Sequence, residues 1–149
     1  MKRVLTIVVV TLLAGGAAPG ANLGAESRAS IAAGPVKVTI HYKGKGTIDA
    51  SHKLWVWLFD TPNIGPQSMP IDQATLEANG AEAVFEGVAP GQVWIAVAFD
   101  EKGVMTGNEP PPTGTPIGIL MGSDGMPTAV APGPKGTVVL TFDDSIRMP

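Results

Sequence analysis

Short apolar runs, each ended by glycine, proline, asparagine or aspartate, recur along the chain and limit how long its structural elements can be. Residues 36–42 alternate apolar and polar side chains without a fault, which is typical of a strand with one buried face. No long segment shows a helical period, and the 19 glycines and 14 prolines are widely spread. The sequence therefore predicts an all-β domain, a single β-sandwich of about seven strands.

The strands can be placed from their apolar patterns and the turn residues between them. The pair Asn79-Gly80 favours a tight hairpin, because both residues tolerate positive φ. Strands are expected over residues 36–42, 54–59, 75–78, 83–88, 93–99 and 137–142, with short edge strands over 117–120 and 128–130.

The first 25 residues have the three parts of a secretory signal peptide. Lys2 and Arg3 are basic, residues 4–13 form an uncharged apolar run, and small residues follow as far as Ala25. The run is too short for a lasting transmembrane anchor, although an uncleaved anchor is the alternative. We expect a cleaved signal peptide over 1–25, a flexible lead-in over 26–35, and a sandwich domain over 36–144. The mature protein would be periplasmic or secreted, without stable membrane insertion.

The charge and the composition exclude several classes of function. Removal of Lys2 and Arg3 lowers the number of Lys and Arg from 10 to 8 against 13 Asp and Glu, which changes the net charge from −3 to −5. A negative domain without a basic cluster is a poor candidate for binding nucleic acid. The chain has no cysteine, and neither His41 nor His52 lies in a catalytic-triad motif. The sequence therefore predicts a protein that is not an enzyme.

Residues 103–136 are rich in glycine and proline. Eight of these residues are glycine and seven are proline, so few of them can join the centre of a sheet. A segment this long is typical of a functional loop or lid. Short edge strands joined by irregular chain are the alternative.

The aromatic residues of 54–59 alternate with aliphatic residues, so the two kinds point to opposite faces of the strand. In residues 93–99, a bulky set alternates with Trp94, Ala96 and Ala98. This bulky set consists of Val93, Ile95, Val97 and Phe99. If these two strands pair with like faces together, the tryptophans lie over the alanines on the outer face, covered by residues 103–136. Indole rings at this spacing could stack a sugar unit or a peptide side chain. The alternative places the rings in the core. The candidate ligand-binding residues are Trp55, Trp57 and Trp94.

Three strands end in Phe-Asp, at Asp60, Asp100 and Asp143. Alternating strand directions would place Asp100 and Asp143 at one end of the sandwich and Asp60 at the other. Carboxylate oxygens are the ligands that Ca²⁺ prefers. The alternative is that these acids are simply solvated at strand ends. The candidate calcium ligands are Asp100, Glu101, Asp143 and Asp144.

Residues 85–103 carry the one recognisable motif. It runs Phe85-Glu86-Gly87-Val88-Ala89-Pro90-Gly91-Gln92-Val93, then a strand, then Asp100-Glu101-Lys102-Gly103. It resembles the strand entry and the "D-E-N-G" turn of carboxypeptidase regulatory-like (transthyretin-type) domains, and is most similar to a bacterial secreted family of unknown function. The resemblance extends loosely over 36–143 and implies an Ig-like or transthyretin-like sandwich that acts as an accessory module. The chain departs from the family after Asp100, where Lys102, Val104 and Met105 replace oxygen ligands.

These observations predict a secreted or periplasmic, non-catalytic binding or accessory module. Its partner would be an extracellular or envelope ligand, a carbohydrate or a peptide, recognised through the aromatic face. A calcium-dependent envelope module using the acidic strand ends and a purely structural envelope protein are the alternatives.

Overall fold

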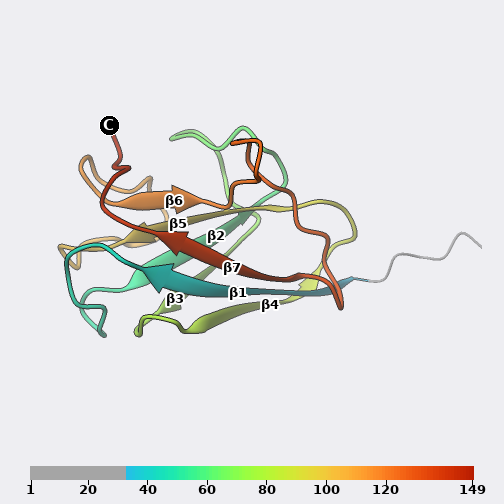
Figure 1. Cartoon of the computed structure of the whole chain (residues 1–149), viewed down its shortest axis with the longest axis horizontal. Helices are drawn as coiled ribbons and strands as arrows, with labels where there is room; N and C mark the ends of the chain where they lie inside the picture. Colours follow the sequence, from blue (N-terminus) through green and yellow to red (C-terminus); the bar gives the residue numbers. More distant parts are fainter. Residues whose placement is uncertain (1–32) are drawn as a thin grey trace, which may run out of the picture.

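The computed structural model describes residues 33–149, so the predicted signal peptide and most of the lead-in lie outside the described residues. The described part is all-β, with seven strands and no helix. The strands form two sheets, with the orders β4-β1-β7 and β3-β2-β5-β6, and Figure 1 shows the three-stranded sheet in front of the four-stranded one. The predicted sandwich architecture is confirmed. The strands are β1 (Gly34–Tyr42), β2 (Leu54–Phe59), β3 (Asp72–Leu76), β4 (Glu82–Val88), β5 (Trp94–Phe99), β6 (Ile117–Ile119) and β7 (Thr137–Phe142).

The three-stranded sheet is built around β1, which is antiparallel to β4 and parallel to β7. The alternation of β1 buries Val36, Val38 and Ile40 completely between the sheets, as its pattern predicts. β1 begins at Gly34, so Gly34 and Pro35, expected in the flexible lead-in, belong to the sheet instead.

The four-stranded sheet pairs β2 antiparallel to both β3 and β5, and β6 lies beyond β5. The aliphatic residues of β2 and the bulky set of 93–99 point inward and form the main core with β1, β4 and β7. Burying these apolar side chains is the principal driving force for closing the sandwich. Among the described residues, no helix is long and apolar enough to cross a membrane.

The predicted hairpin around Asn79-Gly80 is wrong. β3 pairs with β2 in one sheet and β4 pairs with β1 in the other, so the turn connects the two sheets. The Gly80 N–H donates to Ile40 O at 2.8 Å, and Gly80 has a φ of 78°. Asn-Gly does form a tight turn here, but local turn chemistry does not specify which strands pair across it.

The edge strands are only partly as expected. β6 confirms the predicted segment at 117–120. Residues 128–130 form no strand: Val130 makes an isolated bridge with Val93, and the Thr128 N–H donates to Leu120 O at 2.8 Å. The edge of the four-stranded sheet is instead extended by residues 144–149, which we call the C-terminal segment. After β7 this segment crosses to β6, where the Ile117 N–H donates to Ile146 O at 3.0 Å and the Met148 N–H donates to Thr115 O at 2.9 Å.

Candidate functional site

A second apolar cluster lies on the outer face of the four-stranded sheet. It consists of Trp57, Phe59, Ala96 and Ala98, with Trp55 and Trp94 packed against it. The register places Trp57 opposite Ala96 and Trp55 opposite Ala98, which confirms the predicted matching of faces. The rings of Trp55 and Trp57 are stacked, with centroids 6.2 Å apart.

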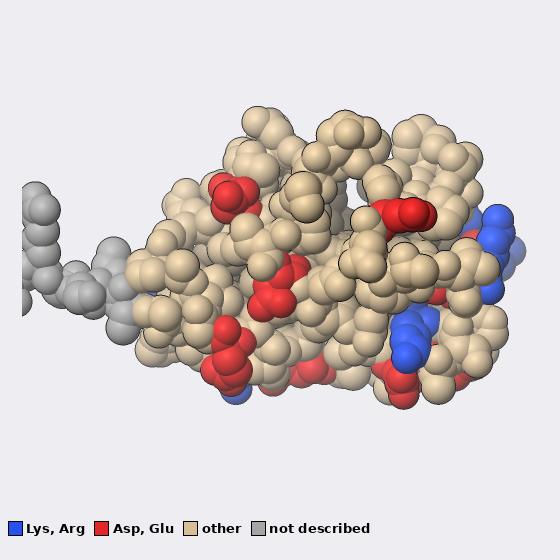
Figure 2. Space-filling model, turned by 180° about the vertical axis from the view of Figure 1, so that it is seen from behind, with Lys and Arg blue, Asp and Glu red and all other residues tan. Residues whose placement is uncertain are grey.

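Two loops stand over this cluster and leave a cavity between them. The cavity has a volume of about 480 Å³, within the range of small-ligand sites, about 300–1,000 Å³. Its floor is formed by side chains of β2, β5 and β6, and its walls by residues 64–70, residues 107–111 and the end of the C-terminal segment. Figure 2, which views the molecule from behind, shows the hollow between the loops. The floor residues include Trp57, Phe59, Ala96, Ile117 and Ile119.

The walls of the cavity are largely apolar. They include Pro66, Pro70, Pro110 and Pro111, whose rings hold the backbone φ fixed. Among the described residues that line the cavity, Glu109 alone has a charged side chain, and the other polar side chains are Gln67, Ser68 and Asn108.

The three polar side chains of the walls differ in how they are used. The Ser68 hydroxyl accepts from the Gly65 N–H and donates to Asn63 O, both at 2.9 Å, and so holds the loop in shape. Gln67 and Asn108 are exposed, and within residues 33–149 their amides make no hydrogen bond. These amides therefore remain available to a ligand.

The second wall is positioned by Asp100 and Gly107. Asp100 is 5% exposed, and its carboxylate accepts the N–H groups of Val104 at 3.0 Å and Met105 at 2.9 Å. Gly107 has a φ of 83°, and a Cβ there would overlap the Trp55 ring. A glycine is therefore required where the loop passes over the indole.

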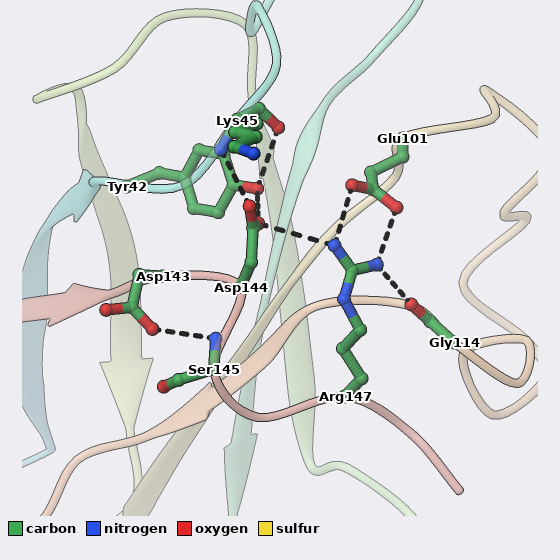
Figure 3. A network of polar contacts seen from close by, with 8 residues as sticks. All are labelled: Tyr42, Lys45, Glu101, Gly114, Asp143, Asp144, Ser145 and Arg147. Atoms are coloured by element: carbon green, nitrogen blue, oxygen red, sulfur yellow. Dashed lines mark hydrogen bonds and ion pairs between the residues drawn. The ribbon is translucent and has the colours of Figure 1, made fainter.

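The C-terminal wall is held by Arg147 (Figure 3). Its guanidinium donates to both carboxylate oxygens of Glu101, at 2.9 and 3.2 Å, and to Gly114 O at 2.6 Å. It also lies 3.6 Å from Asp144, whose carboxylate accepts the Lys45 N–H at 2.8 Å and the Tyr42 hydroxyl. This network fixes the C-terminal segment, and thereby Met148 and Pro149, against the cavity.

The ionisation of the network follows from these contacts. The hydrogen bonds from the Lys45 N–H and the Tyr42 hydroxyl lower the pKa of Asp144. Burial, together with the Asp144 carboxylate, raises the pKa of Tyr42 above its usual value. The hydrogen bonds to Glu101 raise the pKa of Arg147. The Arg147 guanidinium cation therefore lies between the carboxylates of Glu101 and Asp144, and the Tyr42 phenol that donates to Asp144 is neutral.

The acidic candidates lie at one end of the sandwich, but their carboxylates have different partners. The Tyr42 ring packs on Phe99 and Phe142, with centroids 4.7 and 5.0 Å away, so β5 and β7 do finish at the same end, as expected. The Asp143 carboxylate accepts the Ser145 N–H at 2.8 Å, while Glu101 and Asp144 flank the Arg147 cation. Over residues 33–149 no group of three or more His, Cys, Asp or Glu side chains could hold a metal ion. Calcium binding by Asp100, Glu101, Asp143 and Asp144 stays a prediction.

The three tryptophans share one face but not one site. Trp57 forms part of the cavity floor. Trp55 lines a separate, more polar depression with Lys53 and Lys102, and its Nε1–H has no acceptor among the described residues. Trp94 lies opposite Phe59 at the start of β5 and lines neither space.

Sequence reasoning missed the first wall and the C-terminal segment. The run from Pro62 to Pro70 contains three prolines and a glycine, a signal of the same kind as that in 103–136, but shorter. Arg147 follows the last strand without any motif.

Comparisons with known protein families, with curated proteins and with solved structures find no match. A proposal for the function therefore rests on the residues and geometry of the site.

Proposed function

We propose that the protein is an exported, non-catalytic binding module that takes an apolar ligand into the cavity over Trp57. The observation that carries this proposal is an open cavity of about 480 Å³ with an apolar floor on a sheet and rigid proline walls. Apolar surface of this kind gains free energy when a ligand displaces its water. The signal-peptide pattern of residues 1–25 supports a periplasmic or secreted location.

The geometry favours an apolar group over a sugar ring. Trp57 is 6% exposed and stacks on Trp55, so little of the Trp57 ring is free to act as a flat platform. A sugar also needs hydrogen-bond partners around the ring, whereas most of the lining is apolar.

A binding role also agrees better with the cavity than a catalytic one. Of the residues that line it, only Glu109 has an ionisable side chain. Acid–base or nucleophilic catalysis generally pairs two such groups within hydrogen-bond reach. The resemblance of residues 85–103 to carboxypeptidase regulatory-like domains further supports an accessory role.

A neutral fluorescent probe, N-phenyl-1-naphthylamine, tests the proposal. We expect saturable binding to the wild-type protein and at least a tenfold loss in the Ala96→Leu variant, because the larger side chain would fill the floor beside Trp57. Val139→Leu is the matched control, since Val139 is 59% exposed on the three-stranded sheet. Absence of probe binding to the wild type, or equal binding to both leucine variants, would exclude the cavity as the site.

A further inference from the structure

We propose that the ligand of this cavity is an extended peptide segment with apolar side chains flanked by lysine or arginine. The inference rests on the proposed function and adds the chemistry of the ligand. The charge around the cavity and the free amides on its two walls carry it.

The charge of the cavity selects a cation over an anion. Glu109 is the only charged side chain of the lining, without a basic residue to balance it. Residues 33–149 carry seven Lys and Arg against twelve Asp and Glu, and Figure 2 shows acidic side chains spread over the face that contains the hollow. Such a field attracts a ligand with a positive group and repels a carboxylate-bearing one.

The amides on the two walls match a peptide backbone. Gln67 lies in the wall formed by residues 64–70 and Asn108 in the wall formed by 107–111. A side-chain amide presents one acceptor and one donor group, which complement the N–H and C=O of a single residue. The protein already uses this pairing, because the Asn79 Oδ1 accepts the Tyr42 N–H at 2.9 Å and the Asn79 Nδ2 donates to Tyr42 O at 2.8 Å.

The rigidity of the walls favours the same occupant. Each wall contains two prolines, which lose little conformational freedom when a chain enters between them. They are Pro66 and Pro70 on one side and Pro110 and Pro111 on the other. An extended segment would place apolar side chains on the floor while its backbone meets the amides at the rim. A lipid chain would fill the floor but leave both amides unused.

Displacement of the bound naphthylamine probe tests this inference separately from the proposed function. The competitors are an end-blocked peptide of leucine and phenylalanine flanked by lysines, the same peptide flanked by glutamates, and dodecylamine, which is apolar and cationic but has no peptide groups. We expect the lysine peptide to displace the probe at concentrations at least threefold lower than the glutamate peptide, and at lower concentrations than dodecylamine.

Variants locate the contacts. Asn108→Ala should weaken binding of the lysine peptide about fivefold, the effect of losing hydrogen bonds worth about 1 kcal/mol, and should weaken binding of the probe by less, because the probe has no peptide group. Glu109→Gln should reduce the difference in affinity between the lysine-flanked and the glutamate-flanked peptide. Gln67→Ala repeats the first test on the opposite wall if Asn108→Ala does not fold, and Asn63→Ala, an exposed amide outside the lining, is the control.

Two results would overturn the inference while leaving the binding module intact. One is probe binding that neither peptide displaces. The other is displacement by dodecylamine at least as strong as by the lysine peptide, with no effect of Asn108→Ala or Gln67→Ala, which would indicate a lipid-like amphiphile. A wild-type protein that binds no probe would contradict the proposed function itself.

Discussion

The side-chain amide of Asn79 forms two hydrogen bonds with the backbone of Tyr42, accepting its N–H at 2.9 Å and donating to its oxygen at 2.8 Å. The ladder between β1 and β4 ends at the pair Thr39 and Glu82, so Asn79 takes the place of a strand neighbour beyond that end. One side chain thus ties the turn between the two sheets to the end of β1.

Removing this amide should destabilise the whole domain. We expect Asn79→Ala to lower the free energy of unfolding by about 1–3 kcal/mol, because it leaves a partly buried N–H and C=O without partners. Urea denaturation of the protein measures the effect. Asn63→Ala, in an exposed loop, should stay within about 0.5 kcal/mol of wild type. Equal stability of the two variants would contradict the role given to Asn79.

The single tyrosine provides an alkaline test of the Arg147 network. Burial and the Asp144 carboxylate raise the pKa of Tyr42 in the folded protein. Its stabilising contribution is therefore complete below the unfolded pKa of about 10 and decreases as the pH rises beyond it. We expect phenolate absorbance to appear only as the domain unfolds, and Tyr42→Phe to flatten the alkaline fall in stability. Phenolate formation near pH 10 without unfolding would disprove this.

Asp144 allows the corresponding test of the network at acidic pH. Hydrogen bonds from the Lys45 N–H and the Tyr42 hydroxyl lower its pKa in the folded state. The stability that it contributes is present above the unfolded pKa of about 4 and is lost as the pH falls through the lower, folded value. Melting temperatures measured down through this range should fall less steeply for Asp144→Asn than for wild type. If the melting temperatures of the two proteins fell in parallel, the Asp144 carboxylate would contribute nothing to the pH dependence of stability.

The two walls of the cavity contain glycines that should respond differently to alanine. Gly107→Ala should cost about 1–3 kcal/mol, because the residue has positive φ and its Cβ would overlap Trp55. Gly65, on the opposite wall, has no atom within 4 Å of the position of a Cβ. Gly65→Ala should therefore be neutral to within about 0.5 kcal/mol. Chemical denaturation with tryptophan emission as the signal compares the pair, and a neutral Gly107→Ala would mean that this loop does not rest on the indole.

Arg147 should control the order of the C-terminal segment. We expect Arg147→Ala to speed amide hydrogen exchange at Ile117 and Met148, whose N–H groups donate to Ile146 O and Thr115 O and so join this segment to the chain at the start of β6. Probe affinity should fall with it, since Met148 is part of the wall. Arg147→Lys keeps the charge but loses the bidentate contact with Glu101. Its exchange rates and probe affinity should lie between those of wild type and Arg147→Ala. Unchanged exchange in Arg147→Ala would show that the backbone pairing suffices.

The strands and their faces could be predicted because they follow from side-chain periodicity. The alternation of β1 predicts its buried face, and the match of Trp57 with the small Ala96 predicts the register of β2 and β5. The order of the strands within the two sheets could not be predicted from the sequence in the same way. The pair Asn79-Gly80 predicts a turn, but its local sequence carries no information on which sheet the next strand joins.

The cavity could be predicted only in part. The aromatic floor and one covering segment follow from the sequence, because they depend on strand faces and on composition. The other wall and the Arg147 contacts depend on how loops distant in sequence meet. No periodic pattern in the sequence predicts such contacts. The carboxylates of Glu101 and Asp144 show the same limit, since the sequence predicts that both lie at one end of the sandwich but not that both contact Arg147.

The parallel pairing of β1 with β7 joins Lys37 to Thr137, nearly the two ends of the described domain. Pairings so distant in sequence carry a high entropic cost of loop closure and slow the folding reaction. A nascent chain that lacks its last strand cannot complete the three-stranded sheet or cover the core between the sheets. Folding must therefore await the whole domain, a delay that would suit the proposed export, in which the chain crosses a membrane before it folds.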